Sequence, residues 1–168
     1  MCGIIAYKGK REDAAALVLN GLKKLEYRGY DSWGVAARTE GAGHGRQSTE
    51  LFVHKKIGKI GELNLKKLPL PASHLAMAHS RWATHGGVTD GNAHPHSSCG
   101  NEVVIIHNGI IENYLTLKRT LKKKGHRFKS ETDSEVAAHL IEEELKKYKG
   151  KPAATAAKQK KRFEEAVT

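Results

Sequence analysis

The sequence predicts an α+β fold, and three observations support this prediction. Short apolar stretches that are rich in β-branched residues and end at glycine, such as CGIIAYKG at 2–9 and EVVIIHNG at 102–109, are typical of buried strands. Apolar residues recur at three- and four-residue spacing within 12–26, 110–121 and 135–145, which is the pattern of amphipathic helices. The 168 residues, of which 39% are hydrophobic, suffice to bury the core of one domain.

The N-terminal half is expected to supply most of the strands. After the first strand, the spacing predicts a helix over 12–26 that buries the face carrying Ala15, Val18, Leu22 and Leu25. Strands at 34–38 and 50–58 follow, joined by a glycine-rich turn. A further strand begins at His74 and runs into the polar loop 86–101, and loops of this kind carry chemistry more often than cores do.

The C-terminal half is expected to be mainly helical. A helix ends at Gly125, a residue type that commonly caps helices, and its apolar face carries Ile110, Tyr114, Leu117 and Leu121. The segment 126–133 is predicted as another strand. Thr132 and Glu135 have the spacing of a capping box, which would begin a second helix that runs to about Tyr148.

The charge balance is strongly basic, with a formal net charge of +11. Nucleic acid is disfavoured as a partner because the lysine clusters follow polar helix faces and loops, with few aromatic residues for base stacking. No membrane partner is expected either, since no apolar stretch approaches the ~20 residues that span a bilayer. The N-terminus lacks a secretory pattern, and the two cysteines form no disulfide framework, so we expect a cytoplasmic protein.

The histidines of the sequence offer no convincing metal site. The chain has ten histidines, and His94 and His96 face the same way on an extended segment. No carboxylate or cysteine lies at a convincing ligand spacing from this pair. The sequence therefore predicts no metal and no cofactor.

A series of motifs runs along the chain in order. CGI at the N-terminus is followed by YRGYDS at 27–32, HSRWATHG at 79–86, NAHPH at 92–96, HNGIIENY at 107–114 and SETDSE at 130–135. A cysteine such as Cys2 is usually a small buried hydrophobe when it stands alone. The ordered set, however, closely resembles the glutaminase domain of the glutamine:fructose-6-phosphate amidotransferase family over about residues 2–145. These are class II glutamine amidotransferases, which are N-terminal nucleophile hydrolases.

The resemblance implies the architecture and the domain plan. The fold of the family is a four-layer αββα sandwich, so residues 1–150 are expected to be an incomplete glutamine amidotransferase type 2 domain that lacks C-terminal strands, and 151–168 a basic helical tail. In the family, a sugar-phosphate isomerase part that uses fructose 6-phosphate follows the glutaminase domain. Its motifs are absent here, so an isomerase domain or subunit is the implied partner, and homo-oligomers remain open.

The resemblance also implies the reaction, which is hydrolysis of the glutamine side-chain amide to glutamate and ammonia. Cys2 is the implied nucleophile once Met1 is removed, because a free α-amine titrates near neutral pH and can take up the thiol proton. The tetrahedral intermediate needs preorganised donors. By similarity, the Asn108 side-chain amide and the Gly109 backbone N–H form this oxyanion hole.

The remaining site residues bind or cover the substrate. Arg81 matches the clamp for the glutamine α-carboxylate and Asp133 the partner of its α-ammonium, although these two residue types also suit a structural ion pair. The loop that covers glutamine in the family corresponds to Trp82, Thr84, His85 and Gly86. Supporting positions by similarity are Arg28, Gly29 and His94.

Alternatives remain open. The chain could be an inactive fragment or a non-catalytic interaction or regulatory module. It could also be another class II amidotransferase, such as the phosphoribosylamine-forming enzyme. One departure from the family pattern is Trp33, which stands where the family usually has a small residue, so the packing near Cys2 is expected to differ.

Overall fold

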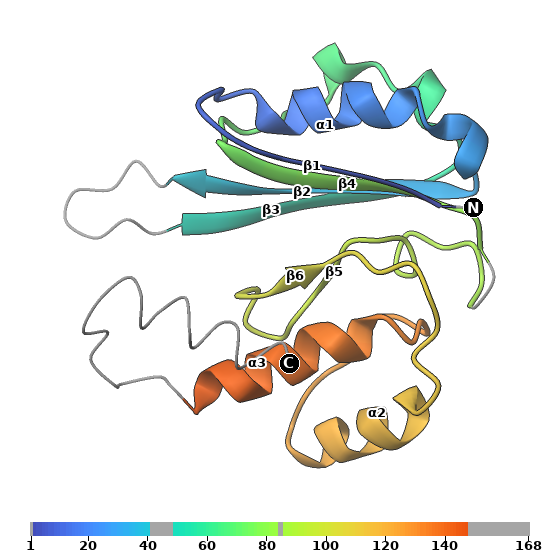
Figure 1. Ribbon diagram of the computed structural model, residues 1–168, viewed down its shortest axis with the longest axis vertical. Coiled ribbons are helices and arrows are strands. Elements are labelled where there is room, and N and C mark those ends of the chain that lie inside the picture. Colours follow the sequence, from blue (N-terminus) through green and yellow to red (C-terminus); the bar gives the residue numbers. More distant parts are fainter. Residues whose placement is uncertain (1, 41–48, 84–85, 148–168) are drawn as a thin grey trace.

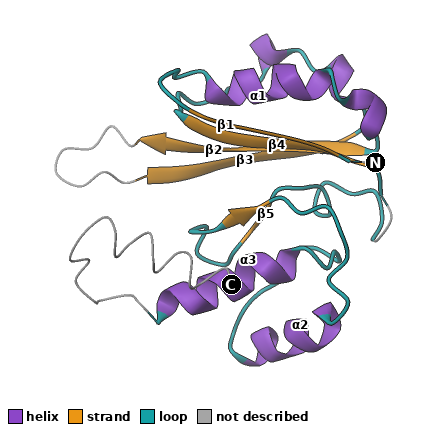
Figure 2. Ribbon diagram, viewed as in Figure 1, coloured by secondary structure: helices purple, strands orange, loops and turns teal. Residues whose placement is uncertain are grey.

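The computed structural model describes residues 2–40, 49–83 and 86–147, which stack in layers (Figure 1). Helix α1 (Ala14–Lys23) covers one face of the main sheet. On the other face lie the short strands β5 (His96–Ser97) and β6 (Val104–Ile105), and beyond them helices α3 (Glu135–Lys146) and α2 (Tyr114–Lys123) (Figure 2). This order of helix, sheet, sheet and helices is the expected αββα sandwich.

The main sheet has four antiparallel strands in the order β1-β4-β2-β3. Their bounds are Gly3–Lys8 for β1, Ser32–Glu40 for β2, Thr49–Ile57 for β3 and Leu75–Arg81 for β4. All four strands predicted for the N-terminal half are confirmed. The turn that joins β2 to β3 and the predicted tail at 151–168 lie outside the described residues.

The first core lies between α1 and the sheet. Val18, Leu19 and Leu22 on α1 are fully buried and pack in one cluster with Val35 of β2 and Ala78 of β4. These α1 residues follow the predicted three- and four-residue spacing, which places them on one helix face. Each buried aliphatic side chain of this size contributes about 1.5–3 kcal/mol relative to exposure.

The alternation of side chains along β4 decides which of its residues face the layer of β5 and β6. Ala76 and Ala78 belong to the core under α1. Because successive side chains of a strand point to opposite faces, His79 and Arg81 face the β5–β6 side. Both are buried there despite their polarity, so the space between the layers is polar at this end of the sheet.

The departure at Trp33 is accommodated in the core. Trp33 is 2% exposed and belongs to the cluster under α1. Its ring lies 5.5 Å from the ring of His54, measured between centroids. The large Trp33 side chain is thus packed in the core between α1 and the main sheet.

The C-terminal half differs from the sequence prediction in four places. The strand expected over 102–109 is reduced to β6, whose ladder partner in the described ranges is the two-residue β5. The strand expected over 126–133 is wrong, because Lys129 N and Ser130 N donate to the Glu135 carboxylate at 2.8 and 2.7 Å and join no strand ladder. This carboxylate therefore holds a loop in place.

The predicted capping box is also wrong. The N-cap of α3 is Ser134, and its side chain makes no capping hydrogen bond. Thr132 instead bonds to His96 Nε2 through its hydroxyl at 2.9 Å. The two predicted helices are confirmed, with Gly125 following α2 at a φ of +92°. The placement of Ile110 on the apolar face of the first of them is wrong, because α2 begins at Tyr114 and Ile110 is exposed.

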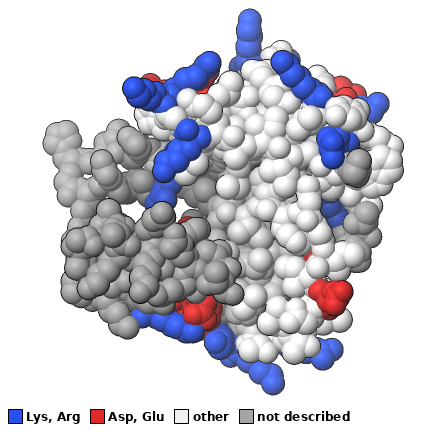
Figure 3. Space-filling model, in the orientation of Figure 1, with Lys and Arg blue, Asp and Glu red and all other residues white. Residues whose placement is uncertain are grey.

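Positive side chains do not gather in one patch on the face of the molecule drawn in Figure 3. Figure 3 shows Lys and Arg spread around the margin of that face, with Asp and Glu beside several of them. Among the described residues, no helix is both long and apolar enough to cross a bilayer.

Candidate active site

A pocket of about 560 Å³ opens at the end of the main sheet where β1 begins and β4 ends. Its lining brings together segments that are far apart in the sequence: the N-terminus, the end of β4, the loop after β6 and the start of α3. The lining residues are Cys2, Arg28, His79, Arg81, Trp82, His94, His107, Asn108, Gly109, Thr132, Asp133 and Ser134. Most of the site residues predicted from the sequence therefore share one cavity.

Cys2 is positioned by the register of the first strand. Gly3 pairs with Ser80, so continuing the ladder places Cys2 opposite Arg81. The Cys2 Sγ accepts a hydrogen bond from Trp82 N at 3.3 Å. Cys2 is partly buried, which leaves the sulfur within the pocket lining and held by the backbone that follows β4.

The Asn108 side chain is oriented by His79. The Nε2 of His79 lies 2.9 Å from Asn108 Oδ1. Since an amide oxygen only accepts, this ring nitrogen is the donor. The Asn108 Oδ1 is thereby engaged, and the two N–H groups of its Nδ2 remain for another acceptor at the pocket.

His79 is neutral at physiological pH. Burial lowers the pKa of His79 to about 4, the hydrogen bond to Asn108 opposes this change, and the charge of Arg81 adds to it. The side chain is fully buried. A neutral imidazole with its proton on Nε2 is the form that holds the Asn108 amide in one orientation.

Gly109 follows directly with a φ of +149°, a backbone conformation that L side chains rarely adopt. A Cβ here would lie 2.9 Å from His107 Nε2. Glycine thus lets the backbone turn beside Asn108 at the pocket. His107 is itself fixed, with its Nδ1 3.1 Å from Ser134 Oγ.

Arg81 places its guanidinium against the loop after β4. Its Nη1 and Nη2 donate to the carbonyls of Gly87 and Gly86 at 3.2 and 3.3 Å. Burial lowers the pKa of Arg81, and the nearby Cys2 and Asp31 raise it. Guanidinium groups remain charged in proteins, so Arg81 supplies a buried cation to the pocket.

Asp133 comes from the other side of the pocket, just before α3. Its Oδ2 accepts from Ile111 N at 2.6 Å, and the residue is 7% exposed. The carboxylate therefore fixes the backbone two residues after Gly109. Arg81 and Asp133 both line the cavity, which gives it a cation and an anion on opposite layers.

The loop 27–32 braces the backbone around Cys2. Gly29 is required for close approach, because a Cβ there would lie 2.8 Å from the carbonyl carbon of Arg81. The Tyr30 and Trp82 rings pack with centroids 5.4 Å apart. The Asp31 carboxylate accepts from Ala83 N at 2.8 Å. Arg28 of the same loop lines the pocket.

His94 lies between two other imidazoles. Its ring centroid is 4.5 Å from that of His79 and 4.4 Å from that of His96. Burial strongly lowers the pKa of His94, and the other two histidines add to the effect. These tilted and edge-on ring contacts make a neutral support at the pocket, which His94 itself lines.

Of the other residues in the loop that is expected to cover glutamine, the structure describes only some. Gly86 has a φ of +73° and its carbonyl accepts from Arg81. Thr84 and His85 lie outside the described residues. The sequence assigned no role to several contributors, among them His79, Asp31, His107 and Ser134, although all four belong to the motifs. The signal for His79 was its position on a predicted buried strand, two residues before Arg81. The signal for Asp31 was its position in the turn that precedes β2.

Comparison with known proteins agrees with this geometry. Residues 69–151 match the sequence family described as glutamine amidotransferase domain. This chain contains a glutamine amidotransferase domain. Its resemblance to glutaminase domains, predicted from the ordered motifs, is confirmed.

Curated relatives of this glutamine amidotransferase domain carry the name glutamine–fructose-6-phosphate aminotransferase (isomerizing). The protein of Pyrococcus horikoshii is 52% identical over 148 residues, which is 87% of this chain and 23% of the relative. Those of Methanococcus maripaludis and Thermus thermophilus are 49% and 52% identical over 150 and 146 residues, and the aligned part is 23% and 22% of their lengths. The chain thus spans under a quarter of these relatives.

Solved structures of related enzymes share the fold. Glutamine phosphoribosylpyrophosphate amidotransferase from B. subtilis matches with a TM-score of 0.68 and 25% identity, covering 99% of this chain and 32% of that enzyme. A structure described as the allosteric regulatory enzyme of purine biosynthesis matches with a TM-score of 0.69 and 27% identity. The glutamine amidotransferase domain therefore has the N-terminal nucleophile hydrolase fold of these proteins.

Proposed function

We propose that this domain hydrolyses the side-chain amide of glutamine and supplies the ammonia for glucosamine 6-phosphate synthesis from fructose 6-phosphate. The observation that carries the proposal is that Cys2, Asn108 and Gly109 line one pocket together with Arg81 and Asp133. The names of the relatives at about half sequence identity support the choice of acceptor. A sugar-phosphate isomerase domain, joined to this one or separate, is the proposed partner, and the cytoplasm is the proposed location.

In the proposed reaction, removal of Met1 exposes the α-amine of Cys2. This amine takes the thiol proton, and the sulfur attacks the amide carbon of glutamine. The oxyanion that forms accepts hydrogen bonds from Asn108 Nδ2 and Gly109 N. The ammonium of Cys2 then protonates the leaving nitrogen, ammonia departs, and a γ-glutamyl thioester remains.

Water completes the cycle. The Cys2 amine takes a proton from the attacking water, a second tetrahedral intermediate forms at the same oxyanion hole, and glutamate leaves as the thiol is reprotonated. Arg81 pairs with the α-carboxylate of glutamine and Asp133 with its α-ammonium. These two contacts at opposite layers orient the amide toward Cys2.

Glutamate release and covalent labelling test the proposal. The chain with Met1 removed, as verified by intact mass, is incubated with glutamine and separately with a chloroketone analogue of glutamine. We expect glutamate release and a single adduct that is absent from Cys2→Ala and retained in Cys99→Ser. Absence of an adduct on processed, folded protein would refute the catalytic role and favour the interaction-module alternative.

A second possible acceptor of the ammonia, phosphoribosylpyrophosphate, is less well supported. The solved phosphoribosylpyrophosphate amidotransferase shares the fold, yet its identity of 25% is about half that of the aminotransferase relatives. Hydrolysis of glutamine by the same groups is common to both alternatives. Coupling to fructose 6-phosphate upon addition of an isomerase partner distinguishes them.

A further inference from the structure

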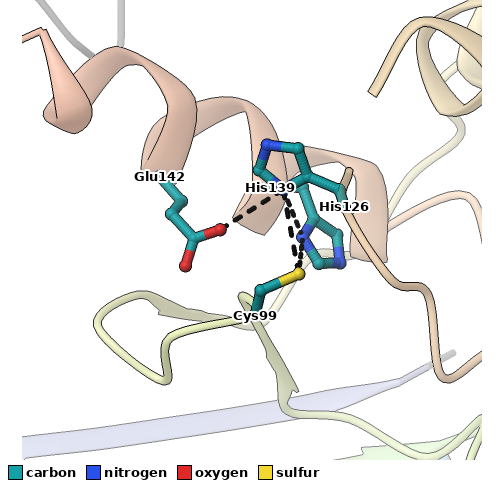
Figure 4. A group of neighbouring side chains, drawn as sticks. All are labelled: Cys99, His126, His139 and Glu142. Carbon is teal, nitrogen blue, oxygen red and sulfur yellow. Dashed lines mark hydrogen bonds and ion pairs between the residues drawn. The ribbon is translucent and has the colours of Figure 1, made fainter. Parts of the chain in front are cut away.

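A second cluster of chemically reactive side chains lies in the layer that contains β5, β6, α2 and α3 (Figure 4). Cys99 follows β5, His126 follows α2, and His139 and Glu142 lie one turn apart on α3. One ligand atom from each of these residues lies within 4.8 Å of all the others. Four chemically suitable donors from three chain segments thus converge on one point, away from the residues that line the active-site pocket.

Four of the six separations between these atoms lie near the edge lengths of a metal-centred tetrahedron. The Nδ1 atoms of His126 and His139 lie 3.1 Å apart, and Cys99 Sγ lies 3.9 and 3.6 Å from them. The Nδ1 of His126 is 3.3 Å from Glu142 Oε2. Zinc bonds of ~2.0–2.1 Å to nitrogen or oxygen and ~2.3 Å to sulfur give tetrahedral edges of about 3.3–3.6 Å.

Outer carboxylates hold the two imidazoles in the orientation that a metal requires. The Nε2 of His126 lies 2.8 Å from Glu143 Oε2, and the Nε2 of His139 lies 3.5 Å from Glu135 Oε1. A metal-binding histidine commonly donates its other ring N–H to a carboxylate in this way, which fixes the tautomer. Both Nδ1 lone pairs are then directed at the shared centre.

Hydrogen bonds also hold the other two donors, Cys99 and Glu142. Cys99 Sγ accepts a hydrogen bond from Arg127 N at 3.2 Å, which holds the sulfur beside the two imidazoles. Glu142 is 3% exposed, and its Oε1 accepts from Gly100 N at 2.7 Å. Its buried Oε2 makes no hydrogen bond in the described part of the chain and faces His126 Nδ1 at 3.3 Å. A buried carboxylate oxygen without a donor is costly unless a cation faces it.

We propose that Cys99, His126, His139 and Glu142 bind one zinc ion in a tetrahedral site. All four positions are filled by protein, so the site is structural, with no open position for substrate. Thiolate and imidazole donors favour Zn²⁺ over Mg²⁺ or Ca²⁺. The sequence did not reveal this set because its members are brought together only by the packing of the Cys99 turn on α3.

The site ties together the segments that carry the second layer of the active-site pocket. The Cys99 turn leads through β6 to Asn108 and Gly109, and α3 begins beside Asp133. A zinc ion would crosslink these segments at their shared contact with His126. The proposal is independent of the glutaminase reaction, because it concerns metal affinity and stability.

Metal titration tests it directly. The full chain, without a polyhistidine tag, is stripped with a chelator and titrated with Co²⁺ and, in competition with a chromophoric chelator, with Zn²⁺. We expect one equivalent of metal, visible bands of tetrahedral cobalt, and a near-ultraviolet thiolate-to-cobalt charge-transfer band. Zinc should also raise the thermal midpoint, by an amount that grows with the free zinc concentration relative to its Kd.

Variants assign the ligands. Cys99→Ser should abolish the charge-transfer band, and Cys2→Ser, the matched cysteine control, should retain it. Glu142→Gln should weaken zinc binding, whereas Glu144→Gln on the exposed side of the same helix should not. Glu143→Gln should lower zinc affinity about 10–100-fold through the orientation of His126.

Two outcomes would overturn the proposal. One is a folded wild-type chain that takes up no metal, which would leave a hydrogen-bonded ion-pair cluster only. The other is metal binding whose charge-transfer band is lost in Cys2→Ser, which would place the ion elsewhere. If Cys99→Ser does not fold, the wild-type spectrum compared with Cys2→Ser still decides between these results.

Discussion

The Nε2 of His79 lies 2.9 Å from the Oδ1 of Asn108, and this contact joins the two layers of the sandwich at the active site. His79 is on the main sheet, whereas Asn108 follows β6 in the layer below. The imidazole thus fixes which end of the Asn108 amide is free to donate. In the proposed reaction His79 is a positioning residue, because it acts on the substrate through Asn108.

The first prediction concerns this contact. Asn108→Ala should lower kcat for glutamine hydrolysis about 10²–10³-fold, since one oxyanion donor is lost. His79→Leu should lower kcat with little change in KM, because the amide loses its orientation but Arg81 and Asp133 remain. Steady-state kinetics measures both.

His79→Gln serves as the conservative control, because its side-chain N–H₂ can replace the donor to Asn108. It should recover part of the kcat lost in His79→Leu. Equal activity of the leucine and glutamine variants, both folded, would contradict the positioning role.

The second prediction concerns Asp133, which has two separable tasks. Asp133→Asn keeps an acceptor for Ile111 N but removes the negative charge, so KM for glutamine should rise about 10–100-fold while stability changes little. Asp133→Ala removes both and should also lower the unfolding free energy. Urea denaturation and steady-state kinetics separate the two effects, and an unchanged KM in Asp133→Asn would exclude Asp133 as the ammonium partner.

The third prediction concerns the backbone at Gly109. Gly109→Ala should destabilise the protein by about 1–3 kcal/mol and reduce kcat, because its φ of +149° is strained for alanine and the new Cβ would contact the His107 ring. Gly87→Ala is a matched control, since the nearest atom to a Cβ there is 3.9 Å away. Chemical denaturation of both variants checks the difference.

The fourth prediction concerns stability in mild acid. Burial lowers the pKa of His79 to about 4 and that of His96 to about 3. The charges of Lys55 and Arg81 lower the pKa of His96 further, and that of Glu135 opposes this change. The unfolded chain binds these protons near pH 6.5, so it holds more protons than the native state at lower pH. Stability should therefore fall as pH drops below about 6.5, with each such proton contributing a slope of about 1.4 kcal/mol per pH unit.

Denaturant titrations between pH 5 and 8 measure this slope. His79→Gln carries no group that titrates in this range and should show a shallower dependence than the wild type. A pH-independent unfolding free energy over this interval would mean that these histidines are not buried in the neutral form.

The fifth prediction concerns the core under α1. Leu22→Ala should lower the unfolding free energy by about 2–5 kcal/mol, because the side chain is fully buried against the sheet and leaves a cavity. The exposed Leu115→Ala on α2 should cost far less. Differential scanning calorimetry on the two variants tests the contrast.

Local patterns in the sequence determined the main sheet, α1, α2 and α3, since alternation and helical spacing report directly on which side chains must be buried. The order of the motifs determined the family and most of the pocket lining, including Cys2, Arg81, Asn108 and Asp133. Only the tertiary structure decided that the carboxylate of Glu135 holds the loop before α3 as irregular backbone. It alone also placed His79 against Asn108 and gathered Cys99, His126, His139 and Glu142, because contacts between distant segments depend on how the layers pack.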